Sequence, residues 1–464
     1  MTVLHHDHSA LDYILARAAD ADVYERWALQ GRSARWCTHP VRLSGTTTTL
    51  DPKSGEILGR YSTRAEPDGV LVKGCGQRRV TACPQCAEVY RTDAWHLIAA
   101  GLQGGKGVAP TVRAHPMIFI TLTAPSFGAV HSRRERSGRA RPCRTGTGRP
   151  CIHGRPRGCG AIHASDDEQL GEPLCPDCFD YRRAVIWNAL ATELWRRTTI
   201  ATTRALAAQA GLTVTALSRL ARLSYVKVVE YQRRGVIHLH VVARLDGPTG
   251  PETPPPIPTV FLERALRQAA TAARVPYPPG RGLPRAARWG AEIDVRQVAP
   301  DGLQAGAVAA YIAKYATKST DAIGRLDHKL KPSDLDALDL RPHLARLVTT
   351  AWDLGGRPEL AHLRLRDWAH TLGFRGHWLT KSRRYSTTFA ALRGARTAWT
   401  RQGPAAQPES AETAVVKDWR YLGRGWANPG DTWLAETAAE ELNETRRLAR
   451  EARRPDRHHP DWGG

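Results

Sequence analysis

Four stretches of the chain alternate apolar and polar residues or are rich in β-branched residues, and both patterns predict β-strands. They are residues 117–124, 225–230, 236–242 and 291–296. The first stretch ends at Pro125, where the strand pattern stops. Within each strand, successive side chains point to opposite faces of the sheet. We therefore expect a sheet whose strands come from distant parts of the sequence.

A short polar turn between the second and third stretches predicts how these two strands pair. A three-residue hairpin loop from Arg233 to Gly235 places a glycine at the left-handed position that such loops favour. In that register Glu230 lies directly opposite His238, on the same face of the sheet. A shift of one residue would move Glu230 to the wrong face.

Other segments repeat apolar residues at helical spacing, as Ile186, Leu190 and Leu194 do. The predicted helices cover 9–30, 92–102, 181–208, 261–273, 303–319, 344–352, 360–372 and 436–453. The order of these elements predicts an α+β fold, with an antiparallel sheet and flanking helices.

The strand at 236–242 carries the first candidate chemistry. His238 and His240 are two residues apart and share one face, so both imidazoles can ligate one divalent ion. With Glu230 they form an N/N/O set, which suits Mn²⁺ or Mg²⁺ without excluding zinc. The alternatives are that the two histidines are an incidental pair and that Glu230 is an ordinary exposed strand residue.

The helix at 303–319 carries the second set of candidate catalytic residues. Helical spacing places four polar side chains on one stripe: Tyr311, Lys314, Tyr315 and Lys318. Val308, Ile312 and Ala316 form an adjacent apolar stripe that can pack on a sheet. Neighbouring lysines would lower the pKa of the phenols and favour nucleophilic attack. The metal-ligand set and the tyrosine helix together suggest one chemistry. The metal polarises a phosphodiester, and a tyrosine attacks the phosphorus.

Three segments in this order, 119–125, 230–240 and 311–318, resemble the ordered motifs of HUH endonucleases, and more closely those of rolling-circle replication initiators. The cysteine-rich front half and the segment 374–386 resemble the RepSA-type initiators of actinobacterial plasmids and integrative elements. The resemblance implies an HUH-like sheet and a metal-dependent nickase that initiates replication at origin DNA, single-stranded or extruded at the nick. It also implies a 5′-phosphotyrosine intermediate. Tyr315 would act first, because its surroundings match both known initiator types, and Tyr311 second.

The chain is strongly basic, with 67 Lys and Arg residues against 45 Asp and Glu and a formal charge of +22. Such an excess favours a polyanionic partner. Four basic residues of one late stretch are candidates for DNA backbone contact, namely Arg375, Lys381, Arg383 and Arg384. A solvated basic loop is the alternative. A host helicase and polymerase are candidate partners of the proposed initiator.

The start of the chain lacks the pattern of a signal peptide, and no run of about 18 apolar residues occurs, so we expect a cytoplasmic protein with no membrane partner. A reducing location argues against disulfides for the nine cysteines. Two C-x-x-C pairs, Cys83/Cys86 and Cys175/Cys178, predict structural zinc. Cys37 and Cys75 would complete the first site. Two of three further cysteines would complete the second, which leaves one over; these are Cys143, Cys151 and Cys159, with His153 and His163 as spare donors.

These observations predict three segments along the chain: a helical and zinc-knuckle lobe at 1–110, a nuclease domain at 111–324, and a basic, mostly helical region at 325–464. A cysteine-rich zinc insertion at 132–180 interrupts the nuclease domain. Two other functions fit the same residues. A conjugative relaxase or HUH transposase would share the chemistry, and a zinc-containing DNA-binding regulator would lack it.

Overall fold

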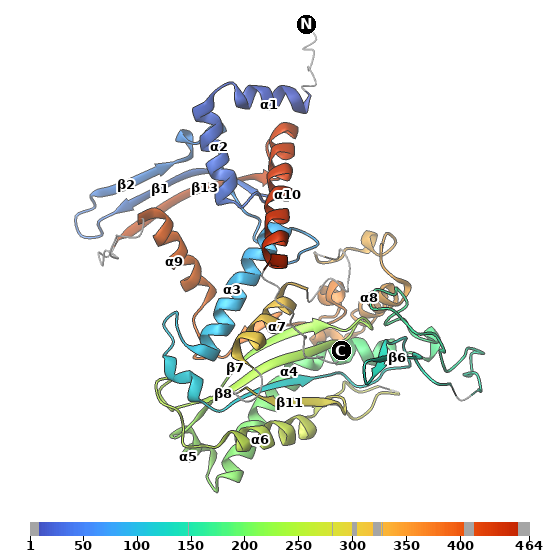
Figure 1. Cartoon of the computed structure of the whole chain (residues 1–464). Coiled ribbons are helices and arrows are strands. Elements are labelled where there is room, and N and C mark those ends of the chain that lie inside the picture. Colours follow the sequence, from blue (N-terminus) through green and yellow to red (C-terminus); the bar gives the residue numbers. More distant parts are fainter. Residues whose placement is uncertain are drawn as a thin grey trace. The chain divides into compact units, whose positions relative to one another are not determined.

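An antiparallel five-stranded sheet forms the centre of the larger part of the molecule (Figure 1). Its strand order is β11 (Ile293–Gln297), β4 (Met117–Leu122), β8 (Ile237–Asp246), β7 (Arg222–Tyr231) and β12 (Leu379–Lys381). The four predicted strands are therefore confirmed, and all four lie in this one sheet. The fifth strand, β12, was missed because three residues are too few to show a pattern.

The computed structural model describes residues 9–146, 148–280, 282–298, 304–318, 326, 328–402 and 413–452. The chain divides into two compact units. The larger unit is Arg91–Thr397 and holds the five-stranded sheet, while the smaller combines Met1–Tyr90 with Ala398–Gly464.

The sheet of the larger unit has two different faces. Even-numbered residues of β4 and odd-numbered residues of β8 are paired and share one face of the sheet. On this face Ile118, Ile120, Leu239 and Val241 join the main apolar core. Helices α4 (Tyr181–Gln209) and α6 (Thr259–Ala272) contribute Trp187, Leu194 and Leu262 to that core, among others. The apolar face of the sheet is thereby covered.

Helix α7 (Ala305–Lys318) lies on the opposite face of the sheet, against β7 (Figure 1). Val308, Ile312 and Ala316 are fully buried, as the predicted apolar stripe requires. The remaining elements of this unit are shorter or peripheral: α5 (Val214–Ser218), α8 (Pro342–Leu354), β9 (Val275–Pro276), β10 (Ala286–Ala287) and the 3₁₀ helices η3 (Pro110–Ala114) and η6 (Pro332–Asp334).

The predicted helix at 360–372 is wrong. The segment forms two 3₁₀ helices, η7 (Pro358–Leu363) and η8 (Arg366–Thr371). Arg364 and Leu372 adopt left-handed conformations, with φ of 51° and 50°, that terminate the two helices. The leucines at helical spacing are buried nonetheless, because the surrounding core holds them individually.

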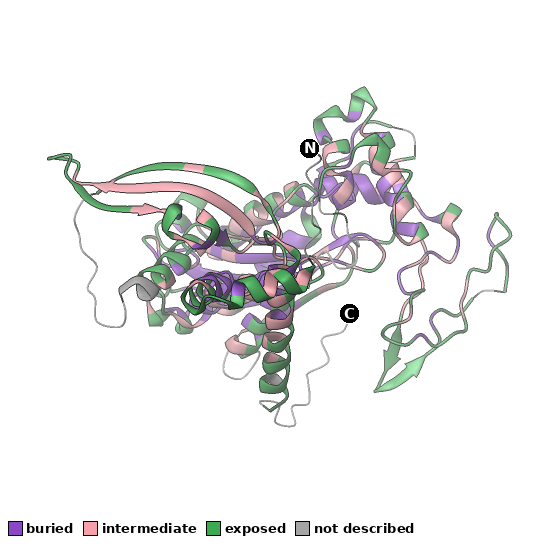
Figure 2. Ribbon diagram, turned by 90° about the horizontal axis from the view of Figure 1, so that it is seen from above, coloured by how far each residue is buried: buried purple, intermediate pink, exposed green. Residues whose placement is uncertain are grey.

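The insertion at 132–180 carries little regular structure. It contains β5 (Arg134–Arg136), β6 (Arg139–Arg141) and the 3₁₀ helix η4 (Pro176–Cys178). Every residue of β5 and β6 is exposed (Figure 2). These two strands therefore contribute nothing to an apolar core.

The smaller unit is built on a four-stranded antiparallel sheet. Strand β1 (Val41–Leu50) pairs with β2 (Ile57–Ser62), β3 (Leu71–Lys73) and β13 (Ala414–Arg424). Three helices accompany it, α1 (Ala10–Ala18), α2 (Ala21–Ser33) and α10 (Pro429–Ala452), with η1 (Thr63–Ala65) and η2 (Pro67–Gly69) in the connections. Its small core joins Trp27 to Trp426, whose ring centroids are 5.5 Å apart.

Two features of this organisation differ from the predicted one. Residues 9–30 form two helices instead of one, because Asp20 accepts hydrogen bonds from the N–H groups of Asp22 and Val23 and begins a second helix. The C-terminal region is divided, since β12 joins the sheet of the larger unit and β13 that of the smaller. The sequence boundaries between the units fall within α3 (Pro84–Gln103) and α9 (Phe389–Gln402).

Among the described residues, the helices are too short or too polar to cross a membrane.

Candidate functional site

The β7–β8 hairpin forms with the predicted loop. Gln232 and Val236 close a loop of three residues by a hydrogen bond of 2.9 Å, and Gly235 has a left-handed φ of 74°. Glu230 is consequently paired with His238 across the two strands. The predicted register is confirmed, and it follows from local turn geometry.

Three side chains converge at this point of the sheet. The Nε2 atoms of His238 and His240 lie 2.8 and 3.2 Å from the same carboxylate oxygen of Glu230. Their candidate ligand atoms all lie within 4.8 Å of one another. On the other side of the His240 ring, Nδ1 lies 3.2 Å from the hydroxyl of Thr121 on β4. This contact orients the ring and directs Nε2 to Glu230, as outer partners of metal-ligating histidines do.

Electrostatics keep this donor set ready for a cation. Burial, together with the neighbouring His238, lowers the pKa of His240 to about 4, so the ring is neutral near pH 7. Burial alone would raise the pKa of Glu230, but hydrogen bonds from His238 and His240 lower it more. A neutral imidazole and an ionised carboxylate are the forms that bind a metal. The residues therefore fit the predicted divalent ion.

Both tyrosines of α7 lie beside His240. The Tyr315 ring stacks on the imidazole with centroids 5.1 Å apart, and the Tyr311 ring meets it edge-on at 5.2 Å. The two phenol rings are 4.8 Å from each other. Tyr311 also packs edge-on against Phe119, whose ring in turn stacks with that of His240. The structure thus gathers all three sequence motifs at one place.

The predicted effect of the lysines on the tyrosines is wrong. Burial and the nearby Glu230 carboxylate raise the pKa of Tyr315, and burial and Tyr315 raise that of Tyr311. Lys314 is exposed, and its Nζ lies 5.6 Å from the centre of the Tyr315 ring, over the π face. The side chain of Lys318 and residues 319–321 of the motif are outside the described residues. Desolvation by the packed helix outweighs the charge of an exposed lysine.

The basic residues predicted to contact DNA lie on β12, the edge strand of the sheet, or close to it in sequence. Lys381 lies on β12 opposite Val226, and burial lowers its pKa. Arg375, Arg383 and Arg384 are exposed, although Arg375 and Arg384 donate hydrogen bonds to nearby backbone carbonyls. Their role in DNA contact stays a prediction. Tyr385, which follows Arg384 in this stretch, is fully buried, and the Arg244 guanidinium lies over its ring.

The first predicted cysteine set is brought together in the smaller unit. Cys37, Cys75, Cys83 and Cys86 place their sulfur atoms within 4.8 Å of one another, and those of Cys37 and Cys83 are 3.6 Å apart. Zinc–sulfur bonds of about 2.3 Å in a tetrahedron require a separation of about 3.8 Å between thiolates. The four cysteines thus have the spacing of a structural zinc site.

The remaining cysteines form two clusters where one was predicted. Cys151, Cys175 and Cys178 group with His153, and Cys143 and Cys159 group with His131 and His163. The expectation that two of Cys143, Cys151 and Cys159 complete the second knuckle is therefore wrong, and no cysteine is left over. The signal that was missed is Cys159-x-x-x-His163, a usual ligand spacing. His131 lies before the insertion and carried no signal of its own.

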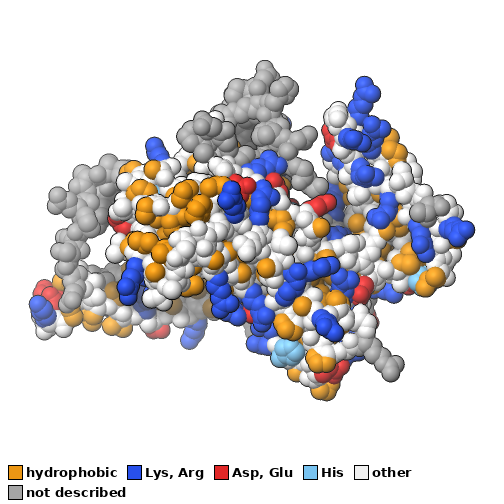
Figure 3. Space-filling view, turned by 90° about the horizontal axis from the view of Figure 1, so that it is seen from below, with side chains coloured by type: hydrophobic (Ala, Val, Ile, Leu, Met, Phe, Trp, Pro, Cys, Tyr) orange, Lys and Arg blue, Asp and Glu red, His pale blue; other side chains and the backbone are white. Residues whose placement is uncertain are grey.

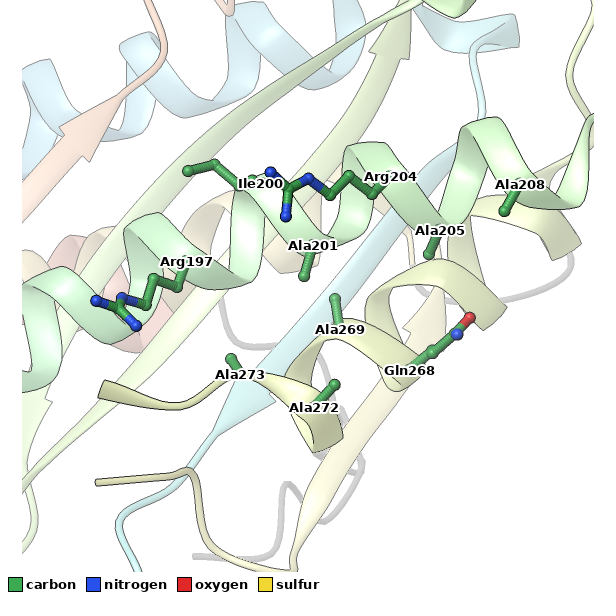
Figure 4. Close-up of a pocket in the computed structure, with 10 residues that line it drawn as sticks. All are labelled: Arg197, Ile200, Ala201, Arg204, Ala205, Ala208, Gln268, Ala269, Ala272 and Ala273. Carbon is green, nitrogen blue, oxygen red and sulfur yellow. The ribbon is translucent and has the colours of Figure 1, made fainter. Parts of the chain in front are cut away.

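A groove between α4 and α6 lies on the sheet face opposite to the tyrosines. It is lined by five alanines and by Arg197, Ile200 and Arg204, with Ala208 and Gln268 at one end (Figure 4). The face of the molecule seen in Figure 3 carries many Lys and Arg side chains and few acidic ones. This agrees with the net charge of +22.

Comparison with known proteins places the chain in a family. The RepSA family model, described as "Replication initiator protein, pSAM2", matches residues 23–440. The chain belongs to the RepSA family of replication initiators. A curated replication initiator protein of Streptomyces ambofaciens is 42% identical to this RepSA-family chain over 459 residues, 94% of the chain and 95% of that protein. No solved structure matches it. The matched region contains the hairpin, the tyrosine helix and every ligand of the three Cys/His clusters.

Proposed function

We propose that this RepSA-family chain initiates rolling-circle replication by nicking and rejoining one strand of origin DNA. The observation that carries the proposal is the meeting of two tyrosine rings with the Glu230–His238–His240 set on one face of the sheet. Two phenols, a carboxylate and two imidazoles are the groups that metal-assisted attack of a tyrosine on a phosphodiester uses. Membership of a replication initiator family supports replication initiation as the biological role of this chemistry.

Glu230, His238 and His240 would hold the divalent ion, Mg²⁺ or Mn²⁺. When bound, such an ion withdraws negative charge from the scissile phosphate and orients it. Thr121 keeps the His240 ring aligned for this task. Phe119 and Tyr315 both stack with the ring, which is buried from water.

In the covalent step, the Tyr315 oxygen forms a bond to phosphorus and the bond between phosphorus and the 3′ oxygen breaks. The phenol loses its proton and the leaving 3′ oxygen gains one, so the 5′ end stays attached to the protein and a 3′-hydroxyl is free for a polymerase. Rejoining reverses these changes. Tyr311, one helical turn away, would attack the regenerated origin after one round.

A supercoiled plasmid that carries the DNA flanking the coding sequence on both sides tests the proposal. With Mn²⁺, wild-type protein should convert it to the nicked form, with the protein on the 5′ end. Tyr315→Phe should lose the adduct, while Tyr311→Phe should form it but fail to close the strand after replication. Mapping of the adduct to Tyr311 alone would reverse the assignment of the two tyrosines.

A matched control is Tyr421→Phe, because Tyr421 is an exposed tyrosine of the smaller unit. It should nick as the wild type does. Binding without nicking, for every divalent ion tried, would reject the enzyme and favour a DNA-binding regulator.

A further inference from the structure

We propose that His131, Cys143, Cys159 and His163 bind a zinc ion whose task is to position the turn of the metal-binding hairpin. The effect on nicking rests on the proposed function, whereas zinc binding and its effect on the hairpin do not. Three steps lead from the cluster to Glu230 and His238: the ligands, a loop at 165–171, and Arg233 in the hairpin turn.

The first step is the donor set. The Nε2 atom of His163 lies 3.2 Å from Nδ1 of His131 and 3.5 Å from the sulfur of Cys159. Tetrahedral zinc, with Zn–N bonds of about 2.0 Å and Zn–S bonds of about 2.3 Å, requires separations of about 3.3 and 3.5 Å. His163 and Cys143 are 3% and 1% exposed, although the insertion around them is largely open.

Outer partners already orient these ligands. The Nδ1 atom of His163 lies 2.7 Å from the Asp167 carboxylate, which leaves the lone pair of Nε2 directed into the cluster. The backbone N–H of Ser132 points to the sulfur of Cys143 at 3.2 Å, as N–H groups do toward thiolates. Carboxylate–histidine pairs of this kind accompany zinc ligands in proteins. They are an observation independent of the clustering itself.

The second step is the loop that follows His163. The Arg233 guanidinium donates hydrogen bonds to the carbonyl oxygens of Ser165, at 2.7 Å, and Asp167, at 2.9 Å. Gly171 approaches the same residue so closely that an added Cβ would lie 2.4 Å from the carbonyl carbon of Arg233. The loop therefore holds Arg233 on two sides.

The third step is the hairpin. Arg233 is the first residue of the three-residue loop that joins β7 to β8, between Glu230 and His238. Arg341 reinforces the arrangement, because it donates to the carbonyl oxygens of Arg233 and Leu170, at 2.9 and 3.0 Å. A turn held in this way presents Glu230 and His238 to a cation in one fixed register.

Zinc would stabilise this arrangement because β5 and β6, the two strands of the insertion, are exposed along their whole length and supply no apolar packing. Without the ion, hydrogen bonds and the separate Cys151, His153, Cys175 and Cys178 cluster would have to oppose the conformational entropy of the loop. We expect loss of the ion to weaken Mn²⁺ binding at Glu230, His238 and His240 about tenfold, the size of effect that outer-shell changes have on metal sites.

The test uses the full chain and two readouts that do not depend on nicking. Wild-type protein should contain three zinc ions, and cobalt substitution should show an S₂N₂ site beside the S₄ and S₃N sites. Cys143→Ser with Cys159→Ser should retain two ions and lose the S₂N₂ spectrum. If that variant does not fold, Arg233→Ala decides, because it removes the link and keeps the ligands. It should retain three zinc ions and bind Mn²⁺ about tenfold more weakly in titrations followed by electron paramagnetic resonance.

Arg133→Ala is the matched control, since Arg133 lies in the same insertion and forms a surface ion pair with Glu135. It should change neither readout. Two ions in wild-type protein, or wild-type Mn²⁺ affinity in Arg233→Ala, would overturn the inference. Weaker Mn²⁺ binding in Arg233→Ala, in a protein that never nicks DNA, would support the coupling and reject the nickase.

Discussion

Asn188 is the buried residue that joins the metal-binding hairpin to the core, and its replacement should be among the most damaging single changes in the larger unit. It is fully buried in α4. Its amide group donates to the carbonyl oxygens of Gly235 and Leu372, both at 3.0 Å. Its carbonyl oxygen accepts from the N–H of Ile237 at 3.2 Å. One side chain thus satisfies three backbone groups.

The expected cost follows from those three bonds. A net hydrogen bond contributes about 1 kcal/mol, and a buried group left without a partner costs about 1–3 kcal/mol. Partial relaxation lowers the total, so Asn188→Ala should lower the free energy of unfolding by about 3–5 kcal/mol. The melting temperature of the larger unit should fall by about 5–8 °C. Asn188→Asp keeps the volume but directs an oxygen at two carbonyl oxygens, and it should be at least as damaging.

Calorimetry gives the stability, and hydrogen exchange of peptides from 225–245 shows whether the loss is local to the hairpin. Thr192→Ala is the matched control, because Thr192 is exposed one turn farther along α4 and its hydroxyl donates a long hydrogen bond of 3.4 Å. It should change stability by less than about 0.5 kcal/mol. An Asn188→Asp protein as stable as the wild type, with unchanged exchange in 225–245, would refute the reasoning.

Three further results are expected. His238→Ala with His240→Ala should abolish Mn²⁺-dependent nicking yet leave non-specific DNA binding nearly unchanged, since the basic surface is intact; equal nicking rates in gel assays would contradict the metal assignment. Cys83→Ser should lose one zinc ion by metal analysis and destabilise the smaller unit, and an unchanged zinc content would exclude the four-cysteine site. Burial lowers the pKa of His343 from an ordinary 6.5 to about 4. The neutral ring therefore contributes on the order of 3 kcal/mol to the free energy of unfolding above pH 6.5, and this contribution is lost as the pH falls toward 4. His343→Gln should flatten this pH dependence in denaturation curves, and an identical slope would argue against it.

The sequence by itself determined the features that depend on neighbouring residues. The loop from Arg233 to Gly235 sets the register that pairs Glu230 with His238, because turn length and a left-handed glycine act locally. Helical spacing likewise separated the buried stripe of α7 from its tyrosines. The Cys83/Cys86 pair was recognisable since its two ligands are three positions apart.

Only the tertiary structure decided which distant segments meet. It brings Tyr315 onto His240, β12 onto β7 and β13 onto β1, and no periodicity encodes such pairings because they depend on the packing of the whole core. It also divides the cysteines of the insertion between two clusters and adds His131, a choice among equivalent donors that spacing leaves open. The tertiary structure also decided the raised pKa values of Tyr311 and Tyr315. Burial by the elements packed around α7 sets these values, and the lysines beside the tyrosines in sequence do not.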